Sequence, residues 1–328
     1  MTALAIDADD VRNAAAQIAG VAVRTPLIEN AVLNAIAGRR VLIKFEGAQH
    51  SGSFKFRGAY NRLSRIAPKD RAAGVVAWSS GNHAQGVAAA ARLLDIPAAI
   101  VMPADAPAIK IANTRALGGQ VVPYDRMTQS REEIATGLAR ERGAIVVPSY
   151  DDPHVIAGQG TTGLEIMEQA AAADAQIGQV LVCCGGGGLV AGIATAIRDI
   201  APSVAIYAVE PAEFDDTARS LASGRRETVR AGALSICDAL MAPSPGALTF
   251  PINQALLAGG LSVTDDEVGA AMRFAFETLK LVVEPGGAVA LAALLHDKAP
   301  HSDTPVAIVL SGANVDAAAY AAILGGAG

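Results

Sequence analysis

Short apolar segments alternate with segments of helical spacing along the middle of the chain. The apolar segments are 75–78, 98–102, 121–122 and 144–147, and the helical segments between them are 82–94, 108–117 and 130–142. Nearly all-apolar runs are typical of strands that are buried on both faces, and strand–helix alternation favours a parallel sheet with right-handed crossovers. The pattern therefore predicts an α/β unit over residues 61–150.

The flanking parts of the chain repeat this pattern less regularly. Strands are predicted at 40–45, 180–184, 205–209 and 305–310, and helices at 8–20, 29–38, 158–173, 189–200, 265–280 and 286–296. Thr264 and Glu267 form a capping-box pattern at the start of the helix predicted for 265–280. Residues 211–263, which are rich in glycine, proline and charge, are predicted to be irregular. These parts predict a second α/β unit.

Composition narrows the classes of function. The net charge of −6, without a basic stripe, argues against nucleic acid as a partner. No apolar run reaches the length of a membrane span, and residues 1–16 lack the basic region of a signal peptide, so we expect a cytoplasmic location. Cys183, Cys184 and Cys237 have no metal-type spacing and are predicted to be reduced core residues.

Lys55 lies where a turn is predicted to enter a helix, between Phe54 and Phe56. Partial desolvation by the two rings would favour the neutral amine, which forms Schiff bases with carbonyl compounds. The alternative is a surface lysine whose aliphatic stem covers apolar area.

Four consecutive glycines, Gly185, Gly186, Gly187 and Gly188, separate a predicted strand from a predicted helix. Glycines allow the backbone to approach an anion closely, and the amides at a helix N-terminus point toward it, so this turn is a candidate phosphate site. A simple tight turn is one alternative. A dinucleotide site is another, because Gly186, Gly188 and Ala191 fit the loose fingerprint and Glu210 ends the next strand.

Two more predicted strands are followed by small polar residues. Ser79 to His83 (Ser-Ser-Gly-Asn-His) follow the strand at 75–78 and begin a helix, where hydroxyl and backbone donors could converge on a carboxylate. A plain helix N-cap is the alternative. Ser311 follows the last strand, where a hydroxyl can contact a ligand in the crevice of an α/β sheet.

These motifs, in this order, resemble the fold-type II enzymes that use pyridoxal 5′-phosphate (PLP), in the threonine/serine dehydratase and serine racemase group. The family's Ser-Phe-Lys segment matches Ser53, Phe54 and Lys55, and its GGGGL loop matches residues 185–189. The resemblance implies a tryptophan synthase β-like α/β fold and a homodimer. It also implies a small domain of residues 61–150 inserted into a large domain of 1–60 and 151–328.

The resemblance assigns a role to each motif. Lys55 would carry PLP beside Phe54, and the loop from Gly185 to Leu189 would hold the PLP phosphate. Ser311 would bond the pyridine nitrogen. The residues expected at the substrate carboxylate are Ser79, Ser80, Asn82 and His83, and Asn82 would also approach the ring oxygen of PLP. Serine racemases carry a serine at the position of Ser80 as the acid/base opposite the lysine, whereas many threonine dehydratases carry alanine there.

Two further expectations come from the racemase-like branch. An arginine at the place of Arg131 reaches the substrate carboxylate in that branch, although a solvated helical arginine is the plain alternative here. Glu210, the carbonyl of Phe214 and Asp216 match the ligand positions of a divalent cation, Mg²⁺, Ca²⁺ or Mn²⁺. A solvated acidic loop would have the same composition.

The expected activity is that of an ammonia-lyase that converts L-threonine or L-serine to 2-oxobutanoate or pyruvate and ammonia. Lys55 would remove the Cα proton, and Ser80 would act only if the enzyme racemises its substrate. The alternatives are serine racemase, 3-hydroxyaspartate dehydratase, a β-replacement enzyme, a PLP-binding protein without activity and, from another class, a nicotinamide-dependent oxidoreductase.

Overall fold

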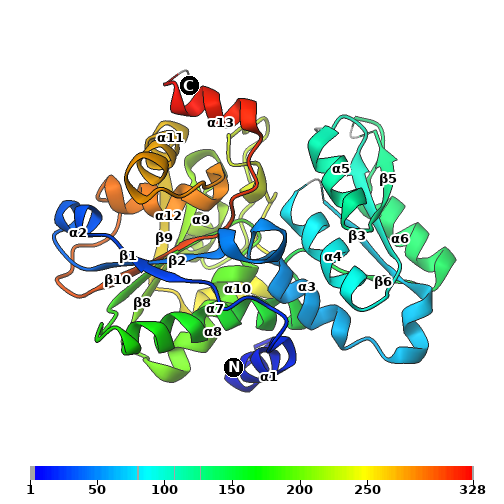
Figure 1. Ribbon diagram of the computed structural model, residues 1–328, viewed down its shortest axis with the longest axis horizontal. Helices are drawn as coiled ribbons and strands as arrows, with labels where there is room; N and C mark the ends of the chain where they lie inside the picture. The colour runs from blue at the N-terminus through cyan, green and yellow to red at the C-terminus, as the bar shows by residue number, and fades with distance from the viewer. Residues whose placement is uncertain (1–3, 80, 107, 126, 327–328) are drawn as a thin grey trace.

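The computed structural model describes residues 4–79, 81–106, 108–125 and 127–326, which form two lobes built around separate sheets (Figure 1). Among these residues, the larger sheet has the strand order β1-β2-β10-β7-β8-β9 and the smaller β5-β4-β3-β6. The larger sheet comprises β1 Leu27–Glu29, β2 Val41–Phe45, β7 Gln179–Cys183, β8 Ala205–Pro211, β9 Gly259–Val263 and β10 Val306–Leu310. The smaller comprises β3 Val75–Trp78, β4 Ala98–Pro103, β5 Gln120–Tyr124 and β6 Ile145–Val146. The described pairings are parallel apart from the antiparallel edge strand β1.

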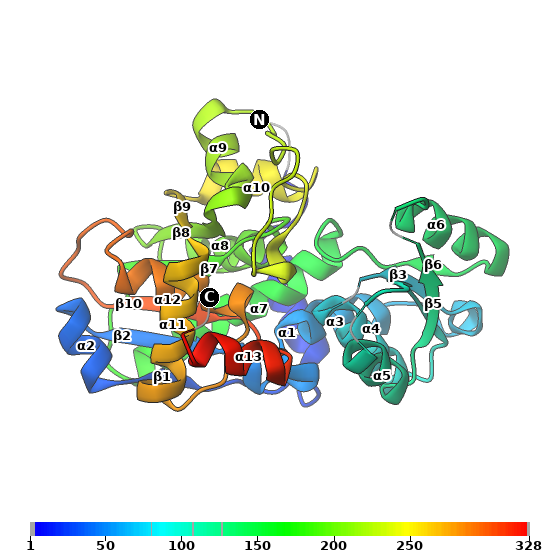
Figure 2. The same cartoon turned by 90° about the horizontal axis from the view of Figure 1, so that it is seen from above.

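Helices cover both faces of each sheet, as the all-apolar strands predict. The helices of the first half are α1 Ala8–Ile18, α2 Ala31–Ala37, α3 Lys55–Ser64, α4 Asn82–Leu93, α5 Ala108–Ala116, α6 Arg131–Arg142 and α7 Pro153–Ala172. The second half adds α8 Gly188–Ile200, α9 Asp216–Ser223, α10 Thr249–Leu256, α11 Asp265–Phe274, α12 Pro285–Leu295 and α13 Ala317–Leu324. In the larger lobe α11 and α12 lie on one side of the sheet, and α7 and α8 on the other (Figures 1 and 2). None of the helices in the described residues has the length and apolar character needed to cross a bilayer.

The alternation of side chains in the smaller sheet explains its two covering layers. Val76 and Val101 pack with Ala135 of α6, whereas Val75 and Ile100 share a cluster with α4 on the opposite face. Successive residues of a strand point to opposite faces, so apolar runs without interruption bury both.

Helix α3 connects the two lobes. It packs against α4 in the smaller lobe and against α7 in the larger one. The predicted domain boundary between residues 60 and 61 falls inside α3, and we retain the division into residues 1–60 with 151–328 and residues 61–150 as a proposal. This position places Lys55, the first residue of α3, between the lobes.

The prediction that residues 211–263 are irregular is wrong. This segment contains α9, α10 and the edge strand β9, which pairs with β8 in parallel. Gly259 and Gly260 begin β9, and glycine is usually depleted in strands, so the sequence carries no strand signal here. A Cβ on Gly260 would lie 2.6 Å from the backbone of Ala218, so the glycine allows α9 to pack closely on the strand.

Local capping explains where several helices begin. Thr264 and Glu267 form the predicted capping box. Helix α7 begins at Pro153, five residues before the predicted start at 158, because the side chain of Asp152 caps it and proline is favourable in a first turn. Both signals are present in the sequence.

Candidate active site

A cavity of about 430 Å³ lies between the two lobes and brings together most of the residues singled out from the sequence. Its walls include Lys55, Asn82, the glycines of residues 185–188 and Ser311. The polar turns that follow β3, β7 and β10 all open into it. Ligands of parallel α/β sheets bind at this carboxyl edge of the strands, so the fold and the cavity identify the same site.

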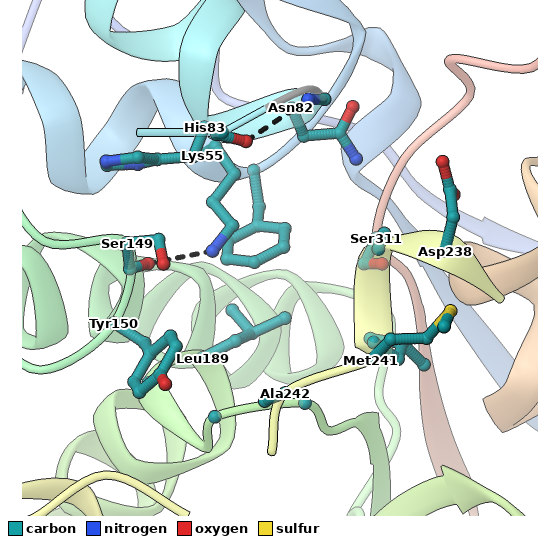
Figure 3. Close-up of a pocket in the computed structure, with 18 of the residues that line it drawn as sticks. Lys55, Asn82, His83, Ser149, Tyr150, Leu189, Asp238, Met241, Ala242 and Ser311 are labelled. Carbon is teal, nitrogen blue, oxygen red and sulfur yellow. Dashed lines mark hydrogen bonds between the residues drawn. The ribbon is translucent and has the colours of Figure 1, made fainter. Parts of the chain in front are cut away.

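The amine of Lys55 points into this cavity (Figure 3). Its Nζ donates to the carbonyl oxygen of Ser149 over 2.8 Å and lies 5.1 Å from the centre of the Phe54 ring. Burial lowers the pKa of Lys55 to about 8. The expected desolvation is therefore present, but of the two flanking rings only Phe54 lies near the amine, since Phe56 packs against His50 and Tyr60 instead.

The glycine turn after β7 has the form of an anion cradle. Gly187 has φ +91°, a conformation that favours glycine, and α8 begins at the next residue without a side-chain cap. The carbonyl oxygen of Gly186 accepts from Thr249 Oγ1 over 2.6 Å and from the amide of Gly246 over 3.2 Å. The amides in the first turn of α8 have no partners within the helix and no side-chain cap, so they are available to an anion.

The side chain of Asn82 is fixed at the start of α4. Its Nδ2 donates to Glu284 Oε1 over 2.6 Å, and its Oδ1 accepts from Asn314 Nδ2 over 2.7 Å. Glu284 is buried, and burial raises the pKa of its carboxyl group to about 8. Ser311 is nearby in the same wall (Figure 3), close enough to Cys183 to lower the pKa of its thiol, which burial raises.

The predicted carboxylate site is described only in part, because Ser80 lies outside the described residues. Ser79 Oγ accepts from the amide of Gly81 over 3.1 Å, which shapes the turn. His83 Nε2 lies 2.9 Å from the carbonyl oxygen of Val147 and must donate to it, so Nδ1 is left as an acceptor. Burial also lowers the pKa of His83 to about 3, so the ring is neutral. The geometry leaves the backbone amide of His83, rather than its ring, as a donor for a carboxylate.

Arg131 begins α6 and lines the cavity from the smaller lobe. Its side chain is 45% exposed, and its Nε lies 3.6 Å from the carboxylate of Glu132. Such a loosely paired arginine can turn toward a ligand without breaking a strong ion pair.

The acidic residues after β8 form a buried pair. Glu210 accepts from the amides of Thr217 and Ala218 over 2.9 and 2.8 Å, which caps α9. Burial and its neighbour Asp216 raise the pKa of Glu210 to about 8, and burial raises that of Asp216 to about 7. A ribose-binding role for Glu210 does not fit, because Glu210 is fully buried and does not line the cavity.

The same pair fits a cation. Asp216 Oδ2 is buried without a hydrogen-bond partner, and Phe214 lies two residues away in the 3-10 turn Ala212–Phe214. A buried, unpartnered carboxylate oxygen is costly unless a cation or proton compensates it. The described residues contain no group of three or more His, Cys, Asp or Glu side chains suited to a metal, so carbonyl oxygens would have to complete the site.

Several residues of the cavity are absent from the sequence-based prediction. They are Trp78, Lys110, Ser149, Tyr150 and Asp238, and behind the cavity wall Thr249, which supports the glycine turn, is absent as well. Thr249 was hidden in the segment predicted to be irregular, and no spacing rule links it to Gly186. Tyr150 packs against the glycine turn, where a Cβ on Gly186 would lie 2.4 Å from its ring.

The cavity holds three groups that fit PLP. The Lys55 amine, whose pKa is lowered, fits the aldehyde, and the glycine turn at the start of α8 fits the phosphate. The hydroxyl of the buried Ser311 fits the ring nitrogen. This set defines a PLP site of fold type II. The model of the family described as pyridoxal-phosphate dependent enzymes matches residues 18–312, and the chain belongs to that family.

Relatives narrow the branch to ammonia-lyases and racemases. An L-threo-3-hydroxyaspartate ammonia-lyase from Pseudomonas sp. is 46% identical, over 97% of this chain and 98% of its own. A serine racemase from Schizosaccharomyces pombe is 39% identical, over 96% of each chain. The structure of maize serine racemase is similar with a TM-score of 0.91 and 38% identity, covering 96% of this chain and 95% of its own. The expected fold class and family are thus confirmed.

Proposed function

We propose that the protein is a PLP-dependent ammonia-lyase that acts on 3-hydroxy amino acids, with L-threo-3-hydroxyaspartate as its preferred substrate. The observation that carries the activity is the Lys55 amine, which points into the cavity beside the glycine turn. The substrate is suggested by the 46% identical relative of that name. L-Threonine and L-serine, the substrates expected from the motifs, become the substrates for comparison.

When bound, PLP supplies an electron-withdrawing system that acidifies the Cα proton of the amino acid. Lys55 holds the cofactor and then accepts the Cα proton, for which an amine with a pKa of about 8 is suited near neutral pH. The amides at the start of α4, together with Ser79, bind the α-carboxylate. Both lobes line the cavity, and displacement of water from it by a bound substrate strengthens these electrostatic contacts.

Phe54, Leu189 and Ser311 complete the proposed cofactor site. Phe54 and Leu189 are buried and contribute apolar surface, and Ser311 offers its hydroxyl to the ring nitrogen. A hydroxyl, unlike a carboxylate, does not stabilise a protonated ring, which favours rapid loss of the 3-hydroxyl group over transamination.

A panel of purified holoenzyme assays tests this proposal. We expect L-threo-3-hydroxyaspartate to give oxaloacetate and ammonia with a higher kcat/KM than L-threonine or L-serine gives for its 2-oxo acid. If none of the three yields a 2-oxo acid, the proposal is wrong. If L-threonine gives the highest kcat/KM, the proposed reaction stands and the proposed substrate is wrong.

Racemisation of serine is the second candidate, favoured by the identity of Ser80 and by the relatives named serine racemase. Ser80 would protonate Cα from the face opposite Lys55. The Ser80→Ala variant should then lose D-serine formation while it retains 2-oxo acid formation. Absence of D-serine from the wild-type reaction excludes this candidate.

A divalent cation, Mg²⁺, Ca²⁺ or Mn²⁺, is proposed at Glu210, Asp216 and the carbonyl oxygen of Phe214. The unpartnered Asp216 Oδ2 supports this site. A homodimer and a cytoplasmic location remain expectations, which size-exclusion chromatography with light scattering and cell fractionation can test.

A further inference from the structure

Lys110 and Asp238 form an ion pair between the two lobes, inside the active-site cavity. Lys110 belongs to α5 of the smaller lobe, and Asp238 begins the 3-10 turn Asp238–Leu240 of the larger one. Lys110 Nζ donates to Asp238 Oδ2 over 2.5 Å, and both side chains line the cavity. Neither residue has a role in the reaction described above.

The ion pair lies near the proposed carboxylate site. The Glu284 carboxylate, which accepts from Asn82, is within electrostatic range of Asp238, Lys110 and Lys55. Figure 3 shows Asp238 on the same side of the cavity as Asn82 and Ser311. The pair therefore lies near Glu284 and Asn82, at the start of α4.

Four cationic side chains of the described residues line this cavity: Lys55, Lys110, Arg131 and Arg226. Lys55 is assigned to the cofactor. Arg226 donates to the carbonyl oxygen of Pro245 over 2.8 Å, and Arg131 is 45% exposed. Lys110 is only 18% exposed and already holds a carboxylate. The charge of Lys110 is therefore less screened by solvent than that of Arg131. The contact of Lys110 with Asp238 shows a position at which a carboxylate binds.

We infer that Lys110 determines specificity by binding the second carboxylate of a dicarboxylic 3-hydroxy amino acid, while Asp238 positions the lysine until that carboxylate replaces it. The inference deepens the proposed function and rests on it for the identity of the substrate. Asp238 is 54% exposed, so it can turn to water when it is displaced. The methyl group of threonine and the hydrogen of serine offer nothing in exchange, and the ion pair then stays intact.

Kinetics of three variants of the holoenzyme test the inference. Lys110→Met should lower kcat/KM for L-threo-3-hydroxyaspartate about 10- to 100-fold, mainly through KM, and change the value for L-serine less than about threefold. Asp238→Asn should raise kcat/KM for the dicarboxylate, because the competing carboxylate is gone. Lys110→Arg should retain most of the preference. Lys298→Met, which breaks an ion pair with Glu267 of 2.8 Å outside the cavity wall, is the matched control and should leave all values unchanged.

A binding measurement separates the inference from the proposed function. Trp78 is the single tryptophan and lines the cavity, so its fluorescence can report binding of succinate and of butyrate to the holoenzyme. We expect wild-type protein to prefer the dicarboxylate succinate, and Lys110→Met to lose that preference. If no substrate is turned over but this dependence on Lys110 is present, the proposed function fails and the dicarboxylate site stands.

The opposite results overturn the inference. If Lys110→Met slows all three substrates equally, or if its preference for succinate equals that of the wild type, the ion pair only links the lobes.

Discussion

Two strand-to-helix turns line the same cavity, yet they are built differently. The turn after β7 is held by Thr249 and Gly246, and the ring of Tyr150 leaves no room for a side chain on Gly186. In the turn after β3, by contrast, nothing lies within 4 Å of a Cβ built on Gly81. Both follow parallel strands and both begin helices, so the difference lies in what packs on them.

This difference matches the two tasks of the proposed site. A cofactor phosphate takes one position through every turnover, and a turn fixed by buried hydrogen bonds holds it at no further ordering cost. A substrate must enter and leave, and sparsely packed turns open more readily. The same contrast extends to the charged groups, since Arg131 in the smaller lobe is half exposed whereas Glu284 in the larger lobe is buried.

The largest expected effect comes from removing the Lys55 amine, which lies in the cavity that both turns line. Lys55→Ala should abolish covalent attachment of PLP and lower kcat at least about 10³-fold, because it removes both the attachment point and the proposed base. Absorbance of the bound cofactor and 2-oxo acid formation measure this. Lys69→Ala, on the exposed surface, is the control. A visible, borohydride-sensitive cofactor band in Lys55→Ala would refute the assignment.

A glycine-to-alanine substitution in each turn tests whether the two turns differ in packing. In Gly186→Ala the new methyl group would lie 2.4 Å from the Tyr150 ring, so we expect a loss of PLP affinity of about 5- to 150-fold. In Gly81→Ala we expect a change below about threefold, because nothing lies within 4 Å of the new methyl group. Titration of the apoproteins with PLP measures both. Equal losses would show that the two turns do not differ in packing.

The buried amine also predicts a pH dependence. Burial lowers the pKa of Lys55 to about 8, and only the neutral amine attacks the cofactor aldehyde. The rate at which apoprotein incorporates PLP should therefore rise about tenfold per pH unit below 8 and level off above it. Absorbance kinetics between pH 6 and 10 test this, with Nα-acetyl-lysine as the reference amine. A rate that keeps rising to the ordinary lysine pKa would contradict burial of the amine.

The smallest expected effect concerns the acidic pair outside the cavity. Mg²⁺ should raise the Tm of the protein by about 2–4 °C, because a ligand that binds only the folded state stabilises it. Glu210→Gln should remove this response, whereas Glu213→Gln, at an exposed position, should keep it. Thermal unfolding with Mg²⁺ or with a chelator measures the difference. An unchanged response in Glu210→Gln would place the cation elsewhere.

Local patterns in the sequence predicted much of the fold, and they failed where long-range packing decides the conformation. The strands of the smaller sheet and the capping box at Thr264 follow from short-range spacing. Strand β9 does not, because Gly260 pairs in the sheet only when β8 and α9 are beside it. Phe56 is next to Lys55 in sequence, but adjacent helical residues point in different directions, so its ring lies elsewhere.

The sequence by itself determined the alternation of strands and helices, the amine at Lys55 and the glycine turn, because each depends on residue types at short spacing. Only the tertiary structure decided how the pieces meet. It paired Lys110 with Asp238, 128 residues later in the chain, and it bonded Thr249 to the carbonyl of Gly186. It also lowered the pKa of Lys55, because desolvation depends on everything packed around a group rather than on its neighbours in sequence.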